Sequence, residues 1–252
     1  MANPFDLSGR TAIVTGANTG IGQGIALALA EAGARVVGVG RSAMDETQAL
    51  VEQAGGRFHA VAADLATIEP VGRIVAEAVA AGGQADILVN NAGIIRRADP
   101  LDFSEQDWDD VININLKTTF FLAQAFARHA VARGGGGKIV NIASVLSFQG
   151  GIRVPPYTAS KHGVVGLTRL LANEWAARGI NVNAIAPGYC ETNNTRAIRD
   201  DPDRNAAILA RIPAGRWAAP ADIGGAAVFL ASRAADYCHG SILAVDGGWL
   251  AR

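Results

Sequence analysis

The chain has 252 residues, close to the upper size of a single domain. Half of them (50%) are hydrophobic and only 18% are charged, which excludes a disordered chain and suggests extensive burial. The 22 basic and 23 acidic residues give a net charge of −1 without a basic stripe, so nucleic acid is not an expected partner.

Short apolar runs rich in β-branched residues alternate with longer alanine-rich segments. The short runs predict strands at 11–15, 35–39, 57–62, 87–90, 138–142, 180–186 and 242–245. The longer segments predict helices at 21–32, 44–54, 70–81, 108–133, 157–177 and 221–232. Parallel strands need right-handed crossovers, so this alternation predicts an α/β Rossmann fold: a doubly wound, seven-stranded parallel sheet with helices on both faces.

No Pro- or Ser-rich linker divides the chain, so we expect one domain over residues 1–252. The interval 188–216 is richer in Asn, Asp and Arg than its surroundings and contains Pro202 and Pro213. We expect this interval to form a mobile lid over the substrate.

The termini, cysteines and histidines indicate no special compartment or metal. No apolar run approaches the ~20 residues that span a bilayer, and the start MANPFD lacks the blocks of a signal peptide. We therefore expect a cytoplasmic protein with no membrane partner. The two cysteines and four histidines share no ligand spacing, so no metal site is expected.

The first predicted strand runs into the turn TGANTGIG at 15–22. Glycines allow a pyrophosphate to approach the backbone, and the following helix presents unpaired N–H groups to it. The spacing Gly-x-x-x-Gly-x-Gly differs from the commoner Gly-x-Gly-x-x-Gly, so a turn without a ligand is the alternative for this motif alone. The residues expected to bind a dinucleotide here are Gly16, Asn18, Thr19, Gly20, Ile21 and Gly22.

Two other strand ends offer further contacts to a dinucleotide. Asp64, with Leu65 beside it, follows the third strand and can accept a hydrogen bond from an adenine amino group. A helix N-cap is the alternative role for Asp64. After the fourth strand, the small residues of Asn91, Ala92 and Gly93 leave room for a ribose.

The end of the second strand bears on the choice of cofactor. An acidic residue there would hold the adenine ribose of NAD, but the chain has Gly40 and Arg41. Arg41 can pair with the 2′-phosphate of NADP, or it can be a solvated arginine stacked on the adenine. We expect NAD as cofactor, with NADP also binding because of Arg41.

The residues predicted to take part in catalysis suit hydride transfer. Tyr157 and Lys161 are four residues apart and so share one helical face. A nearby ammonium, joined by the positive nicotinamide of an oxidised cofactor, favours the phenolate of a tyrosine whose ordinary pKa is ~10. We expect Tyr157 to exchange a proton with an alcohol or ketone, Ser144 to hydrogen-bond the same oxygen, and Asn115 to hold a water.

Each of these residues has an alternative explanation when taken alone. Tyr-x-x-x-Lys occurs by chance in many helices, a serine after a strand is often a cap, and a helical asparagine is usually exposed. The four residues nevertheless follow the nucleotide-binding turn in the chain, each beyond a strand or on the helix after it, as hydride transfer with proton exchange requires. We therefore predict that the catalytic residues are Asn115, Ser144, Tyr157 and Lys161.

These motifs, together with Pro187 and Gly188, resemble the short-chain dehydrogenase/reductase family over essentially the whole chain. The resemblance implies that the four predicted residues form a catalytic tetrad, with Lys161 also holding the nicotinamide ribose beside Tyr157. It implies further cofactor contacts at Pro187, Gly188 and Thr192. It also implies a dimer or tetramer, with a homotetramer expected, built partly from the helices at 108–133 and 157–177.

Several longer stretches resemble family members that act on deoxy-keto-sugar acids of uronate breakdown. They lie at 93–97, 103–110, 147–155, 189–195, 212–217 and 246–252. Such a substrate needs a cation for its carboxylate, which arginine pairs through both oxygens, and polar groups for its hydroxyls. The expected substrate contacts are Arg96, Ser144, Gln149, Arg153, Tyr157, Asn193 and Asn194, with Arg216 as a further cation.

Three alternatives stay open at this point. Arg96 and Arg153 can instead make surface or subunit salt bridges. The same fold also serves 3-ketoacyl-thioester reductases, although these need an apolar channel and the stretch 189–199 is polar. A nucleotide-sensing module without turnover is a third reading, against which Tyr157 and Lys161 argue. We expect an NAD(P)-dependent enzyme acting on a CH–OH group of a small keto-sugar acid.

Overall fold

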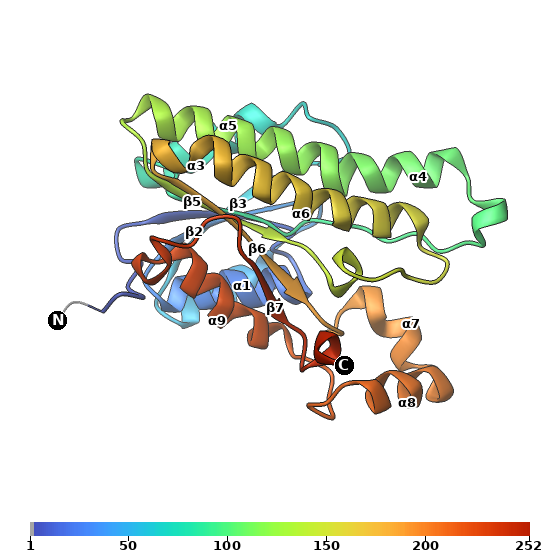
Figure 1. The fold of residues 1–252 in the computed structure, drawn as a ribbon. Coiled ribbons are helices and arrows are strands. Elements are labelled where there is room, and N and C mark those ends of the chain that lie inside the picture. Colours follow the sequence, from blue (N-terminus) through green and yellow to red (C-terminus); the bar gives the residue numbers. More distant parts are fainter. Residues whose placement is uncertain (1–2) are drawn as a thin grey trace.

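The computed structural model describes residues 3–252 and contains the predicted seven-stranded parallel sheet (Figure 1). Its strands are β1 (Thr11–Thr15), β2 (Arg35–Gly40), β3 (Arg57–Ala62), β4 (Ile87–Asn90), β5 (Gly137–Ile142), β6 (Ile180–Pro187) and β7 (Ile242–Val245). They are ordered β3-β2-β1-β4-β5-β6-β7, and every neighbouring pair is parallel. The strand order reverses between β1 and β4, so a crevice opens at their carboxyl ends.

Helices cover both faces of the sheet, as predicted (Figure 1). One face carries α1 (Gly20–Glu31), α2 (Asp45–Gln53) and α9 (Pro220–Ala231). The other carries α3 (Val71–Gly82), α4 (Glu105–Ile112), α5 (Thr119–Ala132) and α6 (Pro155–Trp175). Two short helices, α7 (Arg196–Arg199) and α8 (Pro202–Arg211), lie beyond the carboxyl end of β6. Within residues 3–252, no helix combines the length and apolarity needed to cross a membrane.

The buried apolar side chains form two main layers, one on each face of the sheet. On one side, Ile25 of α1 and Ile223 of α9 pack with Val14 of β1. On the other, Phe126 of α5 packs with Leu88 of β4. Since both faces of the sheet are covered, the central strands β1 and β4 are buried at every residue, whereas the edge strand β3 is largely exposed.

The helix predicted at 108–133 is divided in the structure, and this prediction is corrected. The first part, α4, begins three residues sooner, at Glu105, because the Ser104 hydroxyl accepts a hydrogen bond from the Asp107 N–H at 3.2 Å. A π-helical turn at Asn113–Thr118 then separates α4 from α5. Such turns insert an extra residue and occur often at functional sites.

The other predicted helices and strands end within two residues of the observed ones. The two helices between β6 and α9 were not predicted, although one sequence signal marks α8. The Asp201 carboxylate accepts hydrogen bonds from the N–H groups of Asp203 and Arg204, and Pro202 is the first helical residue. Movement of this segment as a lid stays a prediction.

A buried carboxylate joins three segments at the amino ends of the strands. Asp86, only 2% exposed, accepts hydrogen bonds from the Thr11 N–H at 2.9 Å and from Nη1 of Arg10 and Arg133 at 3.2 and 3.1 Å. These bonds tie the start of β1 and the end of α5 to the residue before β4. Burial of the charge is tolerable because every bond to it is charge-assisted or comes from the backbone.

We expect Asp86→Ala to lower the free energy of unfolding by about 3 kcal/mol, since two guanidinium groups and a buried N–H lose their partner. Urea unfolding measures this loss. The matched control is Asp236→Ala, which removes a 64% exposed carboxylate paired with Lys138 and should cost less than about 1 kcal/mol. Equal losses in the two variants would contradict the role of burial.

Candidate active site

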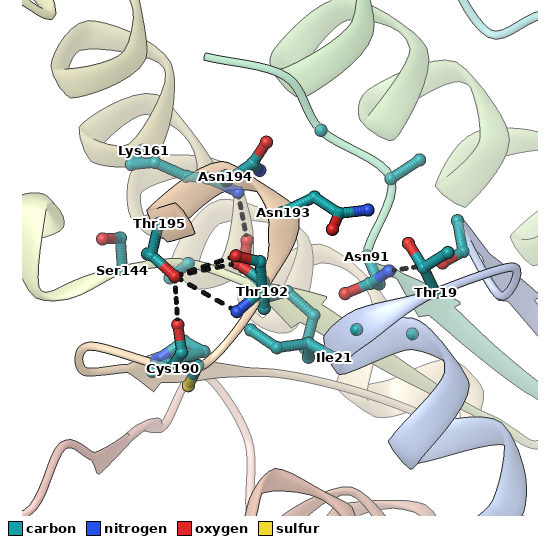
Figure 2. A pocket seen from close by; sticks show the side chains of 18 of the residues that line it. Thr19, Ile21, Asn91, Ser144, Lys161, Cys190, Thr192, Asn193, Asn194 and Thr195 are labelled. Carbon is teal, nitrogen blue, oxygen red and sulfur yellow. Dashed lines mark hydrogen bonds between the residues drawn. The ribbon is translucent and has the colours of Figure 1, made fainter. Parts of the chain in front are cut away.

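A cavity of about 370 Å³ lies at the carboxyl ends of the central strands. Its walls come from the β1–α1 turn, the loop after β4, the end of β5 with α6, and the segment after β6. The predicted site residues that line it are Gly16, Asn18, Thr19, Gly20, Ile21, Gly22, Asn91, Ala92, Gly93, Ser144, Tyr157, Lys161, Pro187, Gly188, Thr192, Asn193 and Asn194. In Figure 2, Ser144 and Lys161 lie on one side of the cavity, with Thr19 and Asn91 on the other.

The β1–α1 turn is shaped to receive a ligand against its backbone. Gly16 has a φ of +65° and Gly20 a φ of +56°, a region that L side chains rarely adopt. A Cβ at Gly22 would collide with the Gly16 carbonyl oxygen. The turn therefore stays tight, and the first N–H groups of α1 stand at the cavity wall, where a phosphate is stabilised. These features fit a dinucleotide.

Asn91 holds this turn in place from the loop after β4. Its Nδ2 donates to the Thr15 carbonyl at 2.8 Å and to the Gly16 carbonyl at 3.2 Å. The backbone N–H groups of Asn91 and Ala92 both donate to the Thr15 hydroxyl at 2.9 Å. The Asn91 amide is thus used to clamp the turn, and any contact that this residue makes to a cofactor comes from its remaining surface.

The residues predicted for the adenine end lie outside the cavity lining. Arg41 is exposed, and the neighbouring Ser42 hydroxyl accepts a hydrogen bond from Asn18 Nδ2 at 2.6 Å. Asp64 is exposed and accepts from the Ala66 N–H at 3.0 Å, so it caps a turn and not α3, which begins after Pro70. The Leu65 side chain is buried, and its carbonyl accepts from the Thr118 hydroxyl at 2.9 Å. The cofactor contacts of these residues remain predictions.

Lys161 lies buried beneath the candidate catalytic tyrosine. Its Nζ donates to the Ile142 carbonyl at 2.6 Å and lies 5.6 Å from the centroid of the Tyr157 ring. The residue is only 5% exposed, and this burial lowers the pKa of the ammonium to about 8. The prediction that the two side chains share one face of a helix is confirmed by α6.

The prediction that the Lys161 ammonium, joined by the positive nicotinamide of an oxidised cofactor, favours the Tyr157 phenolate stays a prediction. Burial raises the pKa of Tyr157 above its ordinary value, and the hydrogen bond with Ser144 and the charge of Arg97 oppose this rise only in part. The Lys161 ammonium is bonded to a backbone carbonyl, and its own charge is weakened by burial. Tyr157 is therefore held as the neutral acid, the form that can donate a proton.

Two serines join the end of β5 to α6. The Ser147 hydroxyl donates to the Lys161 carbonyl at 2.7 Å, and the Ser144 N–H donates to the Ser147 hydroxyl at 3.3 Å. The Ser144 hydroxyl also accepts from the Leu146 N–H at 3.1 Å. The turn is thereby fixed with the Ser144 hydroxyl in the cavity wall, within hydrogen-bonding reach of Tyr157.

Asn115 is buried in the π-helical turn and does not line the cavity. Its Oδ1 accepts from the Ile94 N–H at 2.8 Å, and its Nδ2 donates to the Ile94 carbonyl at 3.0 Å and to the Ser160 hydroxyl at 3.3 Å. The amide is therefore committed to the loop after β4 and to α6. It positions both, and its predicted part in a proton path stays a prediction.

Two of the predicted substrate side chains make contacts within the protein, and a third lies outside the cavity lining. Arg96 forms ion pairs with Asp107 and Asp110 at 3.1 and 3.5 Å, because α4 places both carboxylates beside it. Gln149 Oε1 accepts from Nε1 of the buried Trp249 at 2.9 Å. Arg153 is exposed and lies outside the cavity lining, with a strained φ of +62°. The substrate contacts predicted for these three residues stay predictions, whereas Asn193 and Asn194 do line the cavity.

A family model described as "Enoyl-(Acyl carrier protein) reductase" matches residues 16–250, which is nearly the whole chain. The chain belongs to the short-chain dehydrogenase/reductase family. This confirms the resemblance stated from its motifs, since the match spans the glycine turn, Ser144 and the Tyr157–Lys161 pair.

Relatives within the short-chain dehydrogenase/reductase family match at high identity. A 2-dehydro-3-deoxy-D-gluconate 5-dehydrogenase of Escherichia coli (strain K12) is 60% identical over 248 residues, 98% of each chain. An enzyme with the same name from Bacillus subtilis (strain 168) is 60% identical over 249 residues, 98% of this chain and 97% of its own. The crystal structure of a putative 2-deoxy-D-gluconate 3-dehydrogenase from Agrobacterium tumefaciens with bound NADP is 63% identical, with a TM-score of 0.93 over 100% of both chains.

Sequence reasoning missed Arg97, although it named the adjacent Arg96. Arg97 Nη2 donates to the carbonyl of Asn194, a cavity residue, at 3.0 Å. The charge of Arg97 also acts to lower the pKa of Tyr157. Two consecutive arginines were the only sequence signal, and the sequence does not say which of them contacts the cavity residue Asn194.

Cys190 also lines the cavity and was not predicted to do so. Burial, with the Asp222 carboxylate, raises the pKa of the thiol to about 12. Nucleophilic chemistry needs the thiolate, so this cysteine acts as a small apolar wall residue.

The pKa of Lys161 predicts a pH dependence of stability. Folded Lys161 loses its proton near pH 8, whereas the unfolded chain keeps it to pH 10.5. The unfolded state therefore binds more protons across this interval, and the free energy of unfolding rises with pH by up to about 3 kcal/mol from this group. Lys161→Met should lack the rise. Urea unfolding of both proteins through this pH range measures the difference, and parallel curves would contradict a buried ammonium.

Proposed function

We propose that this protein is a 2-dehydro-3-deoxy-D-gluconate 5-dehydrogenase, an NAD(P)-dependent oxidoreductase of a keto-deoxy sugar acid. One observation carries the proposal: Ser144, Tyr157 and Lys161 meet in one polar cavity, in a chain about 60% identical over its full length to enzymes of that name. The name implies that the carbon changing oxidation state is carbon 5 of the substrate.

The chain's own residues supply the proton step. Tyr157, held neutral by burial, donates its proton to a ketone oxygen, or in the reverse direction accepts the proton of the alcohol. Ser144 hydrogen-bonds the same oxygen and keeps it beside the phenol. The Lys161 ammonium stabilises the phenolate formed after donation. A bound nicotinamide supplies or accepts the hydride.

We propose that Arg97 binds the substrate carboxylate, in place of Arg96 and Arg153. Among residues 3–252, Arg97 has no carboxylate partner, and its side chain contacts the cavity residue Asn194. Asn193 and Asn194 supply amides for the substrate hydroxyls. A polar wall of this kind suits a sugar acid better than the acyl chain of a ketoacyl thioester.

We further propose that the segment at 188–216 acts as a lid of a single domain and that the protein is a homotetramer. Exposed apolar side chains on the outer helices support such an assembly: Trp108 of α4 is 41% exposed, Val131 of α5 is 40% exposed and Leu170 of α6 is 49% exposed. Patches of this kind on one layer of a soluble domain favour contact between subunits.

For the cofactor, we propose that both NAD and NADP bind and that Arg41 favours NADP. The Arg41 guanidinium is exposed, and no acidic residue stands at the end of β2 to hold a free ribose. The relative from Agrobacterium tumefaciens binds NADP.

We expect Arg41→Ala to lower kcat/KM for NADPH by about 10- to 100-fold and to leave kcat/KM for NADH nearly unchanged, since only the 2′-phosphate pairs with this arginine. Steady-state kinetics with each cofactor measures the ratio. Arg10→Ala, at the opposite end of the strands, is the control. An unchanged ratio in Arg41→Ala would remove this residue from cofactor discrimination.

The proposed activity predicts that purified protein oxidises 2-dehydro-3-deoxy-D-gluconate as it reduces NAD or NADP, followed by the absorbance of the reduced nicotinamide. Tyr157→Phe should lose at least about a hundredfold in kcat because the proton donor is absent, while cofactor affinity persists. A 3-ketoacyl thioester serves as the competing substrate with reduced cofactor. Turnover of the thioester alone would overturn the proposal, and cofactor binding without turnover of either compound would favour a sensing role.

A further inference from the structure

Trp249, close to the C-terminus, lies behind the wall of the candidate active site. Its side chain is only 3% exposed and packs in an apolar cluster with Val145 and Tyr189. Val145 directly follows Ser144, which lines the cavity, and Tyr189 directly precedes the cavity residue Cys190. The indole is thus packed with two parts of the cavity wall, the turn after β5 and the segment after β6.

A hydrogen bond fixes the indole to the turn that carries Ser144. Trp249 Nε1 donates to Gln149 Oε1 at 2.9 Å. Ser144 caps the 3₁₀ turn at Val145–Ser147, and Gln149 follows shortly after that turn. Val145 packs in the cluster of the indole at the start of the turn, and Gln149 is bonded to the indole after its end. The turn is therefore held to Trp249 from both sides.

Residues that follow β6 fix the direction of the indole. The centroid of the Tyr189 ring lies 4.7 Å from that of the Trp249 ring. The guanidinium of Arg211, on α8, lies 3.9 Å from the same indole centroid, where a cation is attracted to the ring. A rotation of the indole would break these contacts, so they keep its N–H directed at Gln149.

The C-terminal turn is itself anchored to the end of β7. The Asp246 carboxylate accepts hydrogen bonds from the N–H groups of Gly248 and Leu250, each at 2.9 Å. A Cβ at the cavity residue Gly188 would come within 2.6 Å of the Asp246 Cα, so the turn lies directly against the cavity segment. In Figure 1, the C-terminal turn lies beyond the end of β6, together with α7 and α8. The position of Trp249 is therefore set by the fold of the domain.

We propose that Trp249 is a positioning residue for Ser144, acting through its hydrogen bond to Gln149. The inference rests on the proposed function, in which the Ser144 hydroxyl holds the reacting oxygen. The turn with Ser144 is attached to α6 by Ser147 and to the C-terminal turn by Gln149. Without the second attachment the turn keeps its fold but holds the hydroxyl less closely in place, and a displacement of about 1 Å can lower a rate by about 100-fold.

The test compares kcat and KM for 2-dehydro-3-deoxy-D-gluconate in the wild type, Trp249→Phe and Gln149→Leu. The first variant removes the N–H and keeps an aromatic ring, and the second removes the acceptor. We expect each to lower kcat by about 10- to 100-fold, with KM and the affinity for NADPH, measured by fluorescence, within about twofold of the wild type. The double variant should lose no more than either single variant, because both remove one bond. Gln149→Glu keeps an accepting oxygen and should restore most of kcat.

Trp217→Phe controls for a general loosening of the aromatic cluster. The Trp217 side chain is also buried, and its ring centroid lies 5.4 Å from that of Tyr189. Its Nε1 donates to Asn205 Oδ1 at 2.8 Å, so this bond reaches α8 and not the turn after β5. The substitution removes the same kind of bond and the same ring atoms as in Trp249→Phe. We expect its kcat to stay within about twofold of the wild type.

The same substitution in a Ser144→Ala background tests whether Trp249 acts through Ser144. There, Trp249→Phe should cause no further loss of kcat, because the hydroxyl that it positions is absent. A full further loss in that background, an unchanged kcat in Trp249→Phe, or an equal loss in Trp217→Phe would overturn the positioning role. A raised KM in Gln149→Leu alone would also overturn it, since this side chain would then bind the substrate directly. These outcomes leave the proposed function intact, whereas a wild-type protein that reduces a 3-ketoacyl thioester but does not use the sugar acid would overturn that function itself.

Discussion

The geometry of the candidate active site depends on one hydrogen bond, from the Lys161 ammonium to the carbonyl of Ile142. It joins α6 to the last residue of β5, and one helical turn earlier α6 carries Tyr157. The Ser147 hydroxyl binds the Lys161 carbonyl, so the turn with Ser144 is held to the same residue. The bond offsets part of the cost of burying a charge, a cost that lowers the ammonium pKa to about 8.

Neutral amides hold the loops around this centre. Asn91 clamps the glycine turn, and Asn115 joins the loop after β4 to α6. Deeper in the sheet, Asn90 Nδ2 donates to Asn141 Oδ1 at 2.9 Å, and Asn141 Nδ2 donates to the Thr168 hydroxyl at 3.0 Å. An amide both donates and accepts, so it can satisfy backbone and side-chain partners in a buried place at a lower desolvation cost than a charged group. The charge of the site is thereby left to a few cations.

The arginines around the site differ in whether a neighbouring group already binds them. Arg96 and Arg216 are neutralised by neighbouring carboxylates, and Arg211 is stacked on an indole. Arg97 has no carboxylate partner among residues 3–252, and it donates to the carbonyl of the cavity residue Asn194. An anionic substrate would gain from this charge, whereas an acyl chain would not, which supports the proposed activity.

The sequence by itself determined the sheet, the helices around it, the glycine turn and the Tyr157–Lys161 pair, because these follow from local periodicity and from spacings of a few residues. It marked α8 only through Asp201 and Pro202, and it did not reveal the π-helical turn. Only the tertiary structure decided that Arg96 pairs with two carboxylates while Arg97 contacts Asn194, that Gln149 is bound by Trp249, and that burial raises the pKa of Tyr157. Each of these depends on partners distant in the chain and on burial, which no local pattern encodes.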